Sequence, residues 1–195
     1  MKLKNKKIGF GITGSYCTFF PALQEIISLI NEGAEVFPIL SQAASSVDTR
    51  FGKAADWLEK LRVMTGREPI TTIEAAEPIG PKNILDVLLI APCTGNTLAK
   101  FANGITDTPV LMAAKAQLRN EKPVVLGIST NDGLGANARN LGVLLNVSNV
   151  YFVPFGQDNP LEKNNSLIAH WQLLTETVTL ALQGKQIQPL LVGAN

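Results

Sequence analysis

Residues 91–100, Ala-Pro-Cys-Thr-Gly-Asn-Thr-Leu-Ala-Lys, are the segment of this chain with the clearest potential for chemistry. They follow an apolar run that is typical of a buried strand, and they lead into a helix. In open α/β sheets, a turn rich in hydroxyl and amide groups at the carboxyl end of a strand binds anionic or planar ligands. Thr94, Gly95, Asn96 and Thr97 therefore predict a ligand site. The alternative is a capped loop, because Thr and Asn are ordinary N-cap residues.

A second candidate site is the turn after the first strand. Residues 9–14 match the dinucleotide fingerprint G-x-G-x-x-G, but that fingerprint has to follow a strand, and these glycines fall inside one. The acidic residue that holds a ribose is also missing from the end of the second strand. We therefore expect a tight turn at Gly14 and Ser15, with the Thr13 and Ser15 hydroxyls available to a single phosphate. The alternative is a capped helix, with Ser15 or Thr18 as the cap.

Two further polar loops follow expected strands. Ser41 ends the second strand, and Ser129, Thr130 and Asn131 follow the fourth. Because the carboxyl ends of parallel strands meet at one edge of a sheet, we expect all four loops to lie together there. Hydroxyl and amide groups beside small residues suit a flat heterocycle with a phosphate tail. The sequence therefore predicts one pocket made by four loops.

The remaining reactive side chains do not form a catalytic set, so we assign no catalytic residue. Asp132 is expected to cap the helix after Gly133, with proton transfer as the alternative. His170 is the only histidine, which excludes a histidine-ligated metal centre, and we predict no metal site. Cys17 and Cys93 lack a partner for nucleophilic chemistry, so we expect them to be small, semi-buried side chains.

Composition limits the classes of protein to consider. The chain has 195 residues, 46% of them hydrophobic and 17% charged, with a formal net charge of +1. This length predicts a single domain over residues 1–195. The charge balance gives no reason to expect nucleic acid or an acidic membrane as a partner. The chain has no apolar run of membrane-spanning length, no recognisable signal peptide and no cysteine framework, so we expect a cytoplasmic protein.

Apolar strand-like runs alternate with helical patterns along the chain, which predicts an α/β fold: a three-layer, doubly wound, mostly parallel sheet. The expected strands cover residues 7–13, 34–40, 85–90, 123–129 and 150–153, the last being the final strand. Helical patterns run from Phe19 to Ile30, from Ala54 to Leu61, through Leu98, Phe101 and Ala102, and from Thr108 to Lys115, and Ser166 can cap the start of the final helix. That final helix has an apolar stripe and is expected to end at Gly184. Residues 41–46 are expected to form a polar loop and residues 71–82 to be irregular.

Residues 11–15 and 91–100 resemble the homo-oligomeric flavin-containing cysteine decarboxylase superfamily. There the first loop binds the phosphate of flavin mononucleotide (FMN), and the second, of Pro-x-Ser/Thr-x-Asn-Thr type, lines the flavin. The resemblance implies a Rossmann-like, flavoprotein-like fold, bound FMN and a homo-oligomer. It also implies roles for residues of this chain. Thr13, Gly14 and Ser15 would hold the phosphate, and Ser41, Thr94, Asn96 and Thr97 would face flavin or substrate.

The whole chain also resembles the dipicolinate synthase branch of that superfamily, which belongs to spore-forming bacteria. The runs that carry the resemblance are residues 6–18, 33–36, 49–52, 91–100, 107–115, 123–132 and 153–158. The branch implies a partner, the A subunit, which would resemble a nucleotide-binding dehydrogenase and bind NADP. Together the two chains would oxidise a dicarboxylate, a hydroxy-tetrahydrodipicolinate, to dipicolinic acid during sporulation. The expected location is the cytoplasm of the mother cell.

This chain differs from the superfamily's decarboxylases in three places. Residues 129–132, Ser-Thr-Asn-Asp, replace their Pro-Ala-Met-Asn run, and the chain lacks both their histidine and their cysteine-bearing lid. Decarboxylation of a peptidyl cysteine is therefore not the leading hypothesis. The alternatives to an oxidoreductase subunit are a flavin-dependent decarboxylase-like enzyme and a non-catalytic partner that stabilises the A subunit.

Overall fold

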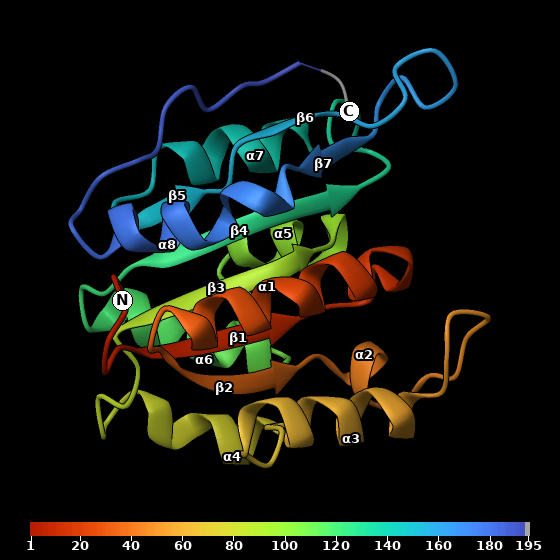
Figure 1. Cartoon of the computed structure of the whole chain (residues 1–195). Helices are drawn as coiled ribbons and strands as arrows, with labels where there is room; N and C mark the ends of the chain where they lie inside the picture. The colour runs from red at the N-terminus through yellow and green to blue at the C-terminus, as the bar shows by residue number, and fades with distance from the viewer. Residues whose placement is uncertain (194–195) are drawn as a thin grey trace.

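The computed structural model describes residues 1–193 and contains one seven-stranded sheet. The strands are β1 (Lys7–Ile12), β2 (Glu35–Leu40), β3 (Val87–Cys93), β4 (Val124–Thr130), β5 (Val150–Phe152), β6 (Phe155–Gln157) and β7 (Leu167–Ala169). Their order is β2-β1-β3-β4-β7-β6, and β5 also pairs with β4 (Figure 1). Strands β1 to β5 pair in parallel, whereas β7 runs antiparallel to both β4 and β6. The carboxyl ends of β1 to β4 therefore share one edge.

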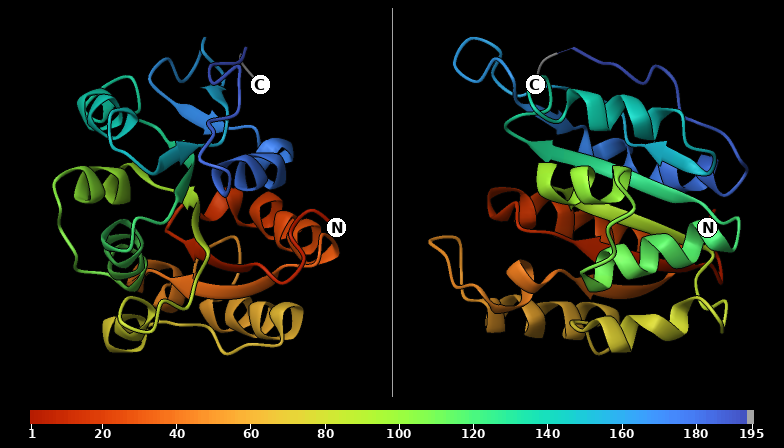
Figure 2. Two further views of the ribbon diagram at one scale, coloured as in Figure 1. Left: turned by 90° about the vertical axis from the view of Figure 1, so that its left-hand side faces the viewer. Right: turned by 180° about the vertical axis from the view of Figure 1, so that it is seen from behind.

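Helices cover both faces of the sheet, which confirms the predicted three-layer α/β fold (Figure 2). The helices are α1 (Phe19–Asn31), α2 (Gln42–Ser46), α3 (Ala54–Thr65), α4 (Ile73–Ala76), α5 (Gly95–Ala102), α6 (Pro109–Arg119), α7 (Ala138–Leu145) and α8 (Leu174–Ala181). Short 3-10 turns cover Tyr16–Thr18, Glu77–Ile79 and Trp171–Leu173. Helices α1 and α8 pack on one face, and α5, α6 and α7 pack on the other.

Strand β3 is apolar at every position because both of its faces are buried. In β3, Leu89 belongs to the core cluster under α1 and α8, whereas its neighbours Leu88 and Ile90 belong to the cluster under α5, α6 and α7. All three side chains are fully buried. A continuous apolar run is thus the expected signature of a parallel strand between two helical layers.

Three predicted loops are more regular than expected. Strand β3 extends through Cys93, so the turn starts at Thr94 and residues 91–93 belong to the sheet. Residues 42–46 form α2, because the Ser41 hydroxyl caps that helix by accepting a hydrogen bond from the Ala44 amide. Residues 71–82, predicted to be irregular, contain α4, which the Thr72 hydroxyl caps. A single Ser or Thr cap stabilises each of these short helices. Helices this short have no long periodic apolar pattern from which they could be predicted.

In the last third of the chain, the strand near residue 150 and the final helix are confirmed, but the predicted start of that helix and the claim that no strand follows residue 153 were wrong. The final helix begins at Leu174, not at Ser166, and β5 is followed by two more strands. Residues 167–169 form β7, in which Leu167 and Ala169 are buried and Ile168 is half-buried. Their apolar residues fit either helical or alternating spacing over so short a run. The segment forms a strand because β7 pairs with β4, with Ser129 opposite Ile168.

Among residues 1–193, no helix has both the length and the apolar composition that crossing a lipid bilayer requires.

Candidate functional site

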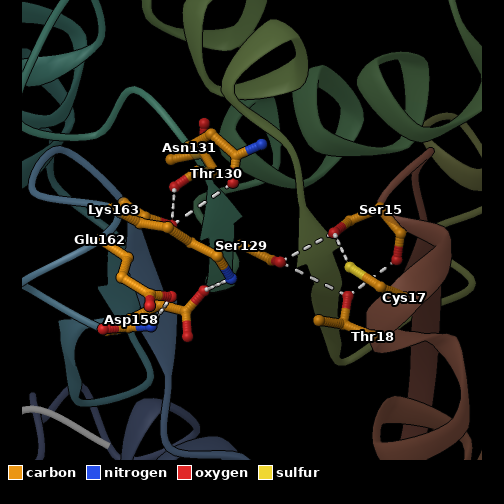
Figure 3. A network of polar contacts seen from close by, with 11 residues as sticks. Ser15, Cys17, Thr18, Ser129, Thr130, Asn131, Asp158, Glu162 and Lys163 are labelled. Atoms are coloured by element: carbon orange, nitrogen blue, oxygen red, sulfur yellow. Dashed lines mark hydrogen bonds and ion pairs between the residues drawn. The ribbon is translucent and has the colours of Figure 1, made fainter.

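Hydrogen bonds join the turn after β1 to the ends of both β3 and β4. The Ser15 and Ser129 hydroxyl oxygens lie 2.8 Å apart although the two residues are 114 positions apart in the sequence (Figure 3). The Thr13 and Thr94 hydroxyl oxygens lie 3.3 Å apart. The expectation that these polar loops meet at one edge of the sheet is therefore correct.

Two adjoining cavities open at this edge. The first, which we call the Ser15 cavity, has a volume of about 430 Å³, and the second, the Ser41 cavity, of about 470 Å³. Gly14 and Thr94 line both cavities. Of the other predicted site residues, the Ser15 cavity contains Ser15, Gly95, Ser129, Thr130 and Asn131, and the Ser41 cavity contains Thr13, Ser41, Asn96 and Thr97. Small-molecule sites occupy about 300–1,000 Å³, so each cavity is large enough for a ligand.

Thr13 connects β1 to β3 and lies next in sequence to Gly14, one of the two residues that line both cavities. Its side chain is only 1% exposed. The hydroxyl donates to the Pro92 carbonyl oxygen at 2.7 Å and accepts from the Thr94 amide at 3.0 Å. A hydroxyl has one proton to donate, and that of Thr13 is used in the hydrogen bond to the Pro92 carbonyl oxygen. While that bond is present, the hydroxyl does not donate to a phosphate. In this structure the Thr13 hydroxyl positions the two strands, and its predicted role in phosphate binding stays a prediction.

The capping alternatives have different outcomes at the two turns. Thr94 does cap α5, since its hydroxyl accepts from the Thr97 amide at 3.3 Å. Ser15 and Thr18 do not cap their helices with their side chains. The Thr18 hydroxyl donates to the Ser15 carbonyl oxygen instead, and the Ser15 hydroxyl pairs with Ser129. The Ser15 side chain therefore connects the turn after β1 to the end of β4.

The glycines of the apparent dinucleotide fingerprint serve packing inside β1. A Cβ atom at Gly9 would lie 2.5 Å from a methyl group of Leu85, and one at Gly11 would lie 3.0 Å from a methyl group of Val110. Both glycines let neighbouring side chains approach the strand, as the position of the fingerprint within a strand predicted.

Asp132 does not cap a helix, so that prediction was wrong. The next helix, α7, begins six residues later at Ala138. The Asp132 carboxylate accepts hydrogen bonds from the Thr130 hydroxyl and from the Asn137 side-chain amide, the latter at 2.9 Å. These hydrogen bonds order the loop after β4, and the side chains that make them lie against the first turn of α5. The close approach requires Gly95, where a Cβ atom would lie 2.5–2.6 Å from polar atoms of all three side chains.

Two charged residues of the site were not among the predicted residues. Asp158 and Lys163 line the Ser15 cavity from the loop between β6 and β7. The sequence run that ends at Asp158 carries a family resemblance but no local signal of where its side chain lies. The position of that side chain depends on the antiparallel pairing of β6 with β7. We did not predict this pairing, because residues 166–169 were expected to begin a helix. The other candidate cation at the site, Lys100, lines the Ser41 cavity and pairs with Asp107 at 2.6 Å.

The two cysteines differ sharply in exposure. Cys93 is fully buried, and this burial raises the pKa of its thiol to about 12. Cys17 is exposed and lines the Ser15 cavity, so the prediction that it is semi-buried was wrong. In residues 1–193, no three metal-ligating side chains gather into a cluster.

Cys93 gives the fold a measurable alkaline sensitivity. Above its ordinary pKa of about 8.5, the thiol loses its proton in the unfolded chain but keeps it in the folded protein. The unfolded state then binds fewer protons, so the free energy of unfolding should fall by about 1.4 kcal/mol per pH unit as pH rises toward the folded-state value. Urea unfolding of the wild type and Cys93→Ala between pH 8 and 10.5 measures this slope. Parallel curves would contradict the assignment, and Cys17→Ala should keep the wild-type slope.

Comparisons with known proteins agree with this architecture. The family model described as Flavoprotein matches residues 1–176. The B subunit of dipicolinate synthase from Bacillus subtilis (strain 168) is 53% identical over 190 residues, which cover 97% of this chain and 95% of the relative. The crystal structure of the corresponding B subunit of dipicolinate synthase from Bacillus halodurans C has a TM-score of 0.92 and 48% identity, with 100% of both chains covered.

More distant solved structures share the fold. The FMN-dependent cysteine decarboxylase SpaF has a TM-score of 0.65 at 21% identity, covering 94% of this chain and 98% of its own. The FMN binding protein AtHal3 has a TM-score of 0.64 at 20% identity, covering 94% and 100%.

Proposed function

Since the chain belongs to the flavoprotein family and, within it, to the branch of the dipicolinate synthase B subunits, we propose that it is the FMN-binding subunit of a two-chain oxidoreductase. The observation that carries the proposal is the pair of cavities that adjoin at Gly14 and Thr94. Two adjoining cavities lined by polar groups and small residues can accommodate a flat ring with a phosphate tail. FMN is named because SpaF and AtHal3, which share the fold, are an FMN-dependent enzyme and an FMN-binding protein.

We place the phosphate in the Ser41 cavity, which Thr13 and Gly14 line but Ser15 does not, so this proposal departs from the resemblance in assigning Ser15 to the other cavity. The Ser41 cavity lies at the N-terminus of α5, where backbone amides and the positive end of the helix dipole favour an anion. Asn96 and Thr97 supply polar groups there, and Lys100 supplies a positive charge on the next turn. The Ser41 hydroxyl lies on the opposite wall.

The Ser15 cavity is proposed to take the ring and the substrate. Ser129, Thr130 and Asn131 offer hydroxyl and amide groups to the edge of a flat ligand. A bound flavin supplies one- or two-electron redox chemistry. The residues of this chain bind the ligand, orient it and, through the apolar Leu167, exclude water from one wall.

The proposed overall reaction converts a hydroxy-tetrahydrodipicolinate to dipicolinate. Its balance requires loss of one water, transfer of one hydride to NADP on the A subunit, and release of one proton. We place the chain, as one domain over residues 1–195, in a homo-oligomer with the A subunit in the mother-cell cytoplasm. Exposed Phe20 and Val63 are apolar side chains that such assembly would cover.

Reconstitution tests this proposal. The purified chain, the A subunit, NADP and the hydroxy-tetrahydrodipicolinate are combined, and dipicolinate is followed by its ultraviolet absorbance. We expect product only when both chains are present, and FMN titration should give the chain a visible flavin band. Full activity of the A subunit alone would contradict the catalytic role. A colourless chain that still activates the A subunit would instead identify a stabilising partner.

A further inference from the structure

The loop between β6 and β7 brings an ion pair to the Ser15 cavity. The ammonium of Lys163 lies 2.9 Å from the carboxylate of Asp158, and both residues line the cavity. Figure 3 shows this pair on the opposite side of Ser129 from Ser15 and Thr18. The loop therefore faces the polar turns that form the rest of the cavity.

Backbone hydrogen bonds hold this loop in place. The Asp158 amide donates to the Ser166 carbonyl at 3.1 Å, and the Ser166 amide donates to the Lys163 carbonyl at 2.9 Å. The Ser166 hydroxyl donates to the Thr130 carbonyl at 3.2 Å, which ties the loop to the end of β4. Lys163 thus has a defined position relative to the strand ends, although its side chain is 53% exposed.

Lys163 is the one cation among the residues that line the Ser15 cavity, within the part of the chain that the structure describes. Lys100 lies in the other cavity, Lys115 lines a separate recess beside α6, and Arg50 stacks on Phe51. Exposed ion pairs contribute little to stability. Replacing Asp158 by a second anion as the partner of the Lys163 ammonium therefore requires little free energy. Asp158 also raises the pKa of Lys163, which keeps the ammonium charged.

We propose that Lys163 is the carboxylate-binding residue of the Ser15 cavity and that one carboxylate of a pyridine-type dicarboxylate displaces Asp158 from its ammonium. The inference deepens the proposed function and rests on it for the class of ligand. Asp158 is then the counter-ion that holds Lys163 in place until the ligand binds. The neutral donors Ser15, Ser129 and Asn131 line the same cavity, so only one carboxylate meets a cation.

Calorimetric titration of the full chain with pyridine-2,6-dicarboxylate tests the assignment. Lys163→Met should weaken binding by about 10- to 100-fold, because a charge-assisted hydrogen bond is lost. Lys163→Arg should stay within about threefold of the wild type, since it keeps the charge. The control is Lys185→Met, an exposed lysine after α8, which should bind like the wild type.

Asp158→Asn tests the displacement step. It removes a negative charge that competes with the ligand, so it should tighten binding of the dicarboxylate by severalfold at low salt and less at high salt. Unchanged or weaker binding at low salt would contradict displacement of Asp158.

A parallel FMN titration separates the two proposals. Lys163→Met should weaken FMN binding far less than dicarboxylate binding, because we place the FMN phosphate in the Ser41 cavity. Equal dicarboxylate affinity in the wild type and Lys163→Met would overturn the role of Lys163, as would a wild type that binds FMN but not the dicarboxylate. A wild type that binds the dicarboxylate through Lys163 but not FMN would support this inference and overturn the flavin proposal.

Discussion

Replacing Gly95 by alanine is expected to destabilise the protein and to disrupt the site at once. The added methyl carbon would lie 2.5–2.6 Å from polar atoms of Thr130, Asp132 and Asn137, closer than real Cβ contacts come. Overpacking of this kind costs about 1–3 kcal/mol. Either these three side chains or the first turn of α5 must then shift, and both belong to the proposed ligand site. FMN affinity should therefore fall at least about tenfold, which corresponds to about 1.4 kcal/mol.

Gly142→Ala is the matched control. Gly142 lies in α7, and nothing is found within 4 Å of a Cβ atom built there. Alanine is favoured over glycine in a helix by about 0.5–1 kcal/mol, so this variant should be slightly more stable than the wild type. Urea unfolding and FMN titration of both variants provide the measurement. If Gly95→Ala matched Gly142→Ala in both assays, the close contact at α5 would be wrong.

Replacing Thr13 by valine is expected to have the second largest effect. Valine has nearly the shape of threonine but lacks the hydroxyl that accepts from the Thr94 amide at 3.0 Å. The Pro92 carbonyl keeps the Thr13 amide as a donor at 3.3 Å, whereas the Thr94 amide loses its acceptor. An unsatisfied buried donor costs about 1–3 kcal/mol, and the loss falls at Thr94, which lines both cavities.

Thr13→Ser separates the hydroxyl from the side-chain shape. Serine keeps the hydroxyl and loses one methyl group, so it should retain most of the stability and the FMN affinity. Denaturant unfolding and FMN titration of the two variants make the comparison. A valine variant as stable as the serine variant would show that the hydrogen bond to Thr94 contributes nothing.

Most strands and long helices of the first two-thirds of the chain could be predicted because their signals are local, whereas the short helices α2 and α4 were missed. The strand at residues 87–93 is apolar at each position. A continuous apolar run is the pattern expected of a strand that is buried on both faces. The helix that begins at Pro109 has Thr108 as its cap and proline in its first turn, both of which are readable in the sequence. These features depend on neighbouring residues, so they need no knowledge of distant contacts.

The prediction for residues 166–173 was wrong because no local signal separates the two candidate structures. Leu167 and Ile168 fit the apolar stripe of a helix that continues to Val178, and they fit a strand equally well. The edge of β4 offers backbone hydrogen bonds to residues 167 and 168, and that pairing exists only once the sheet has formed. Tertiary pairing therefore overrides helical spacing in this segment.

By itself, the sequence determined the parallel α/β layout and the four polar loops at the strand ends, because strand polarity places those ends at one edge. Only the tertiary structure decided how these loops touch. In the folded protein the Thr13 hydroxyl forms hydrogen bonds with the backbone of β3 and of the turn after it. The Asp132 carboxylate accepts hydrogen bonds from Thr130 and Asn137. The tertiary structure also brought Asp158 and Lys163 to the Ser15 cavity. The physical reason is that strand direction is set by local residue patterns, whereas the partners of a polar side chain depend on which distant atoms the folded chain places within hydrogen-bond reach.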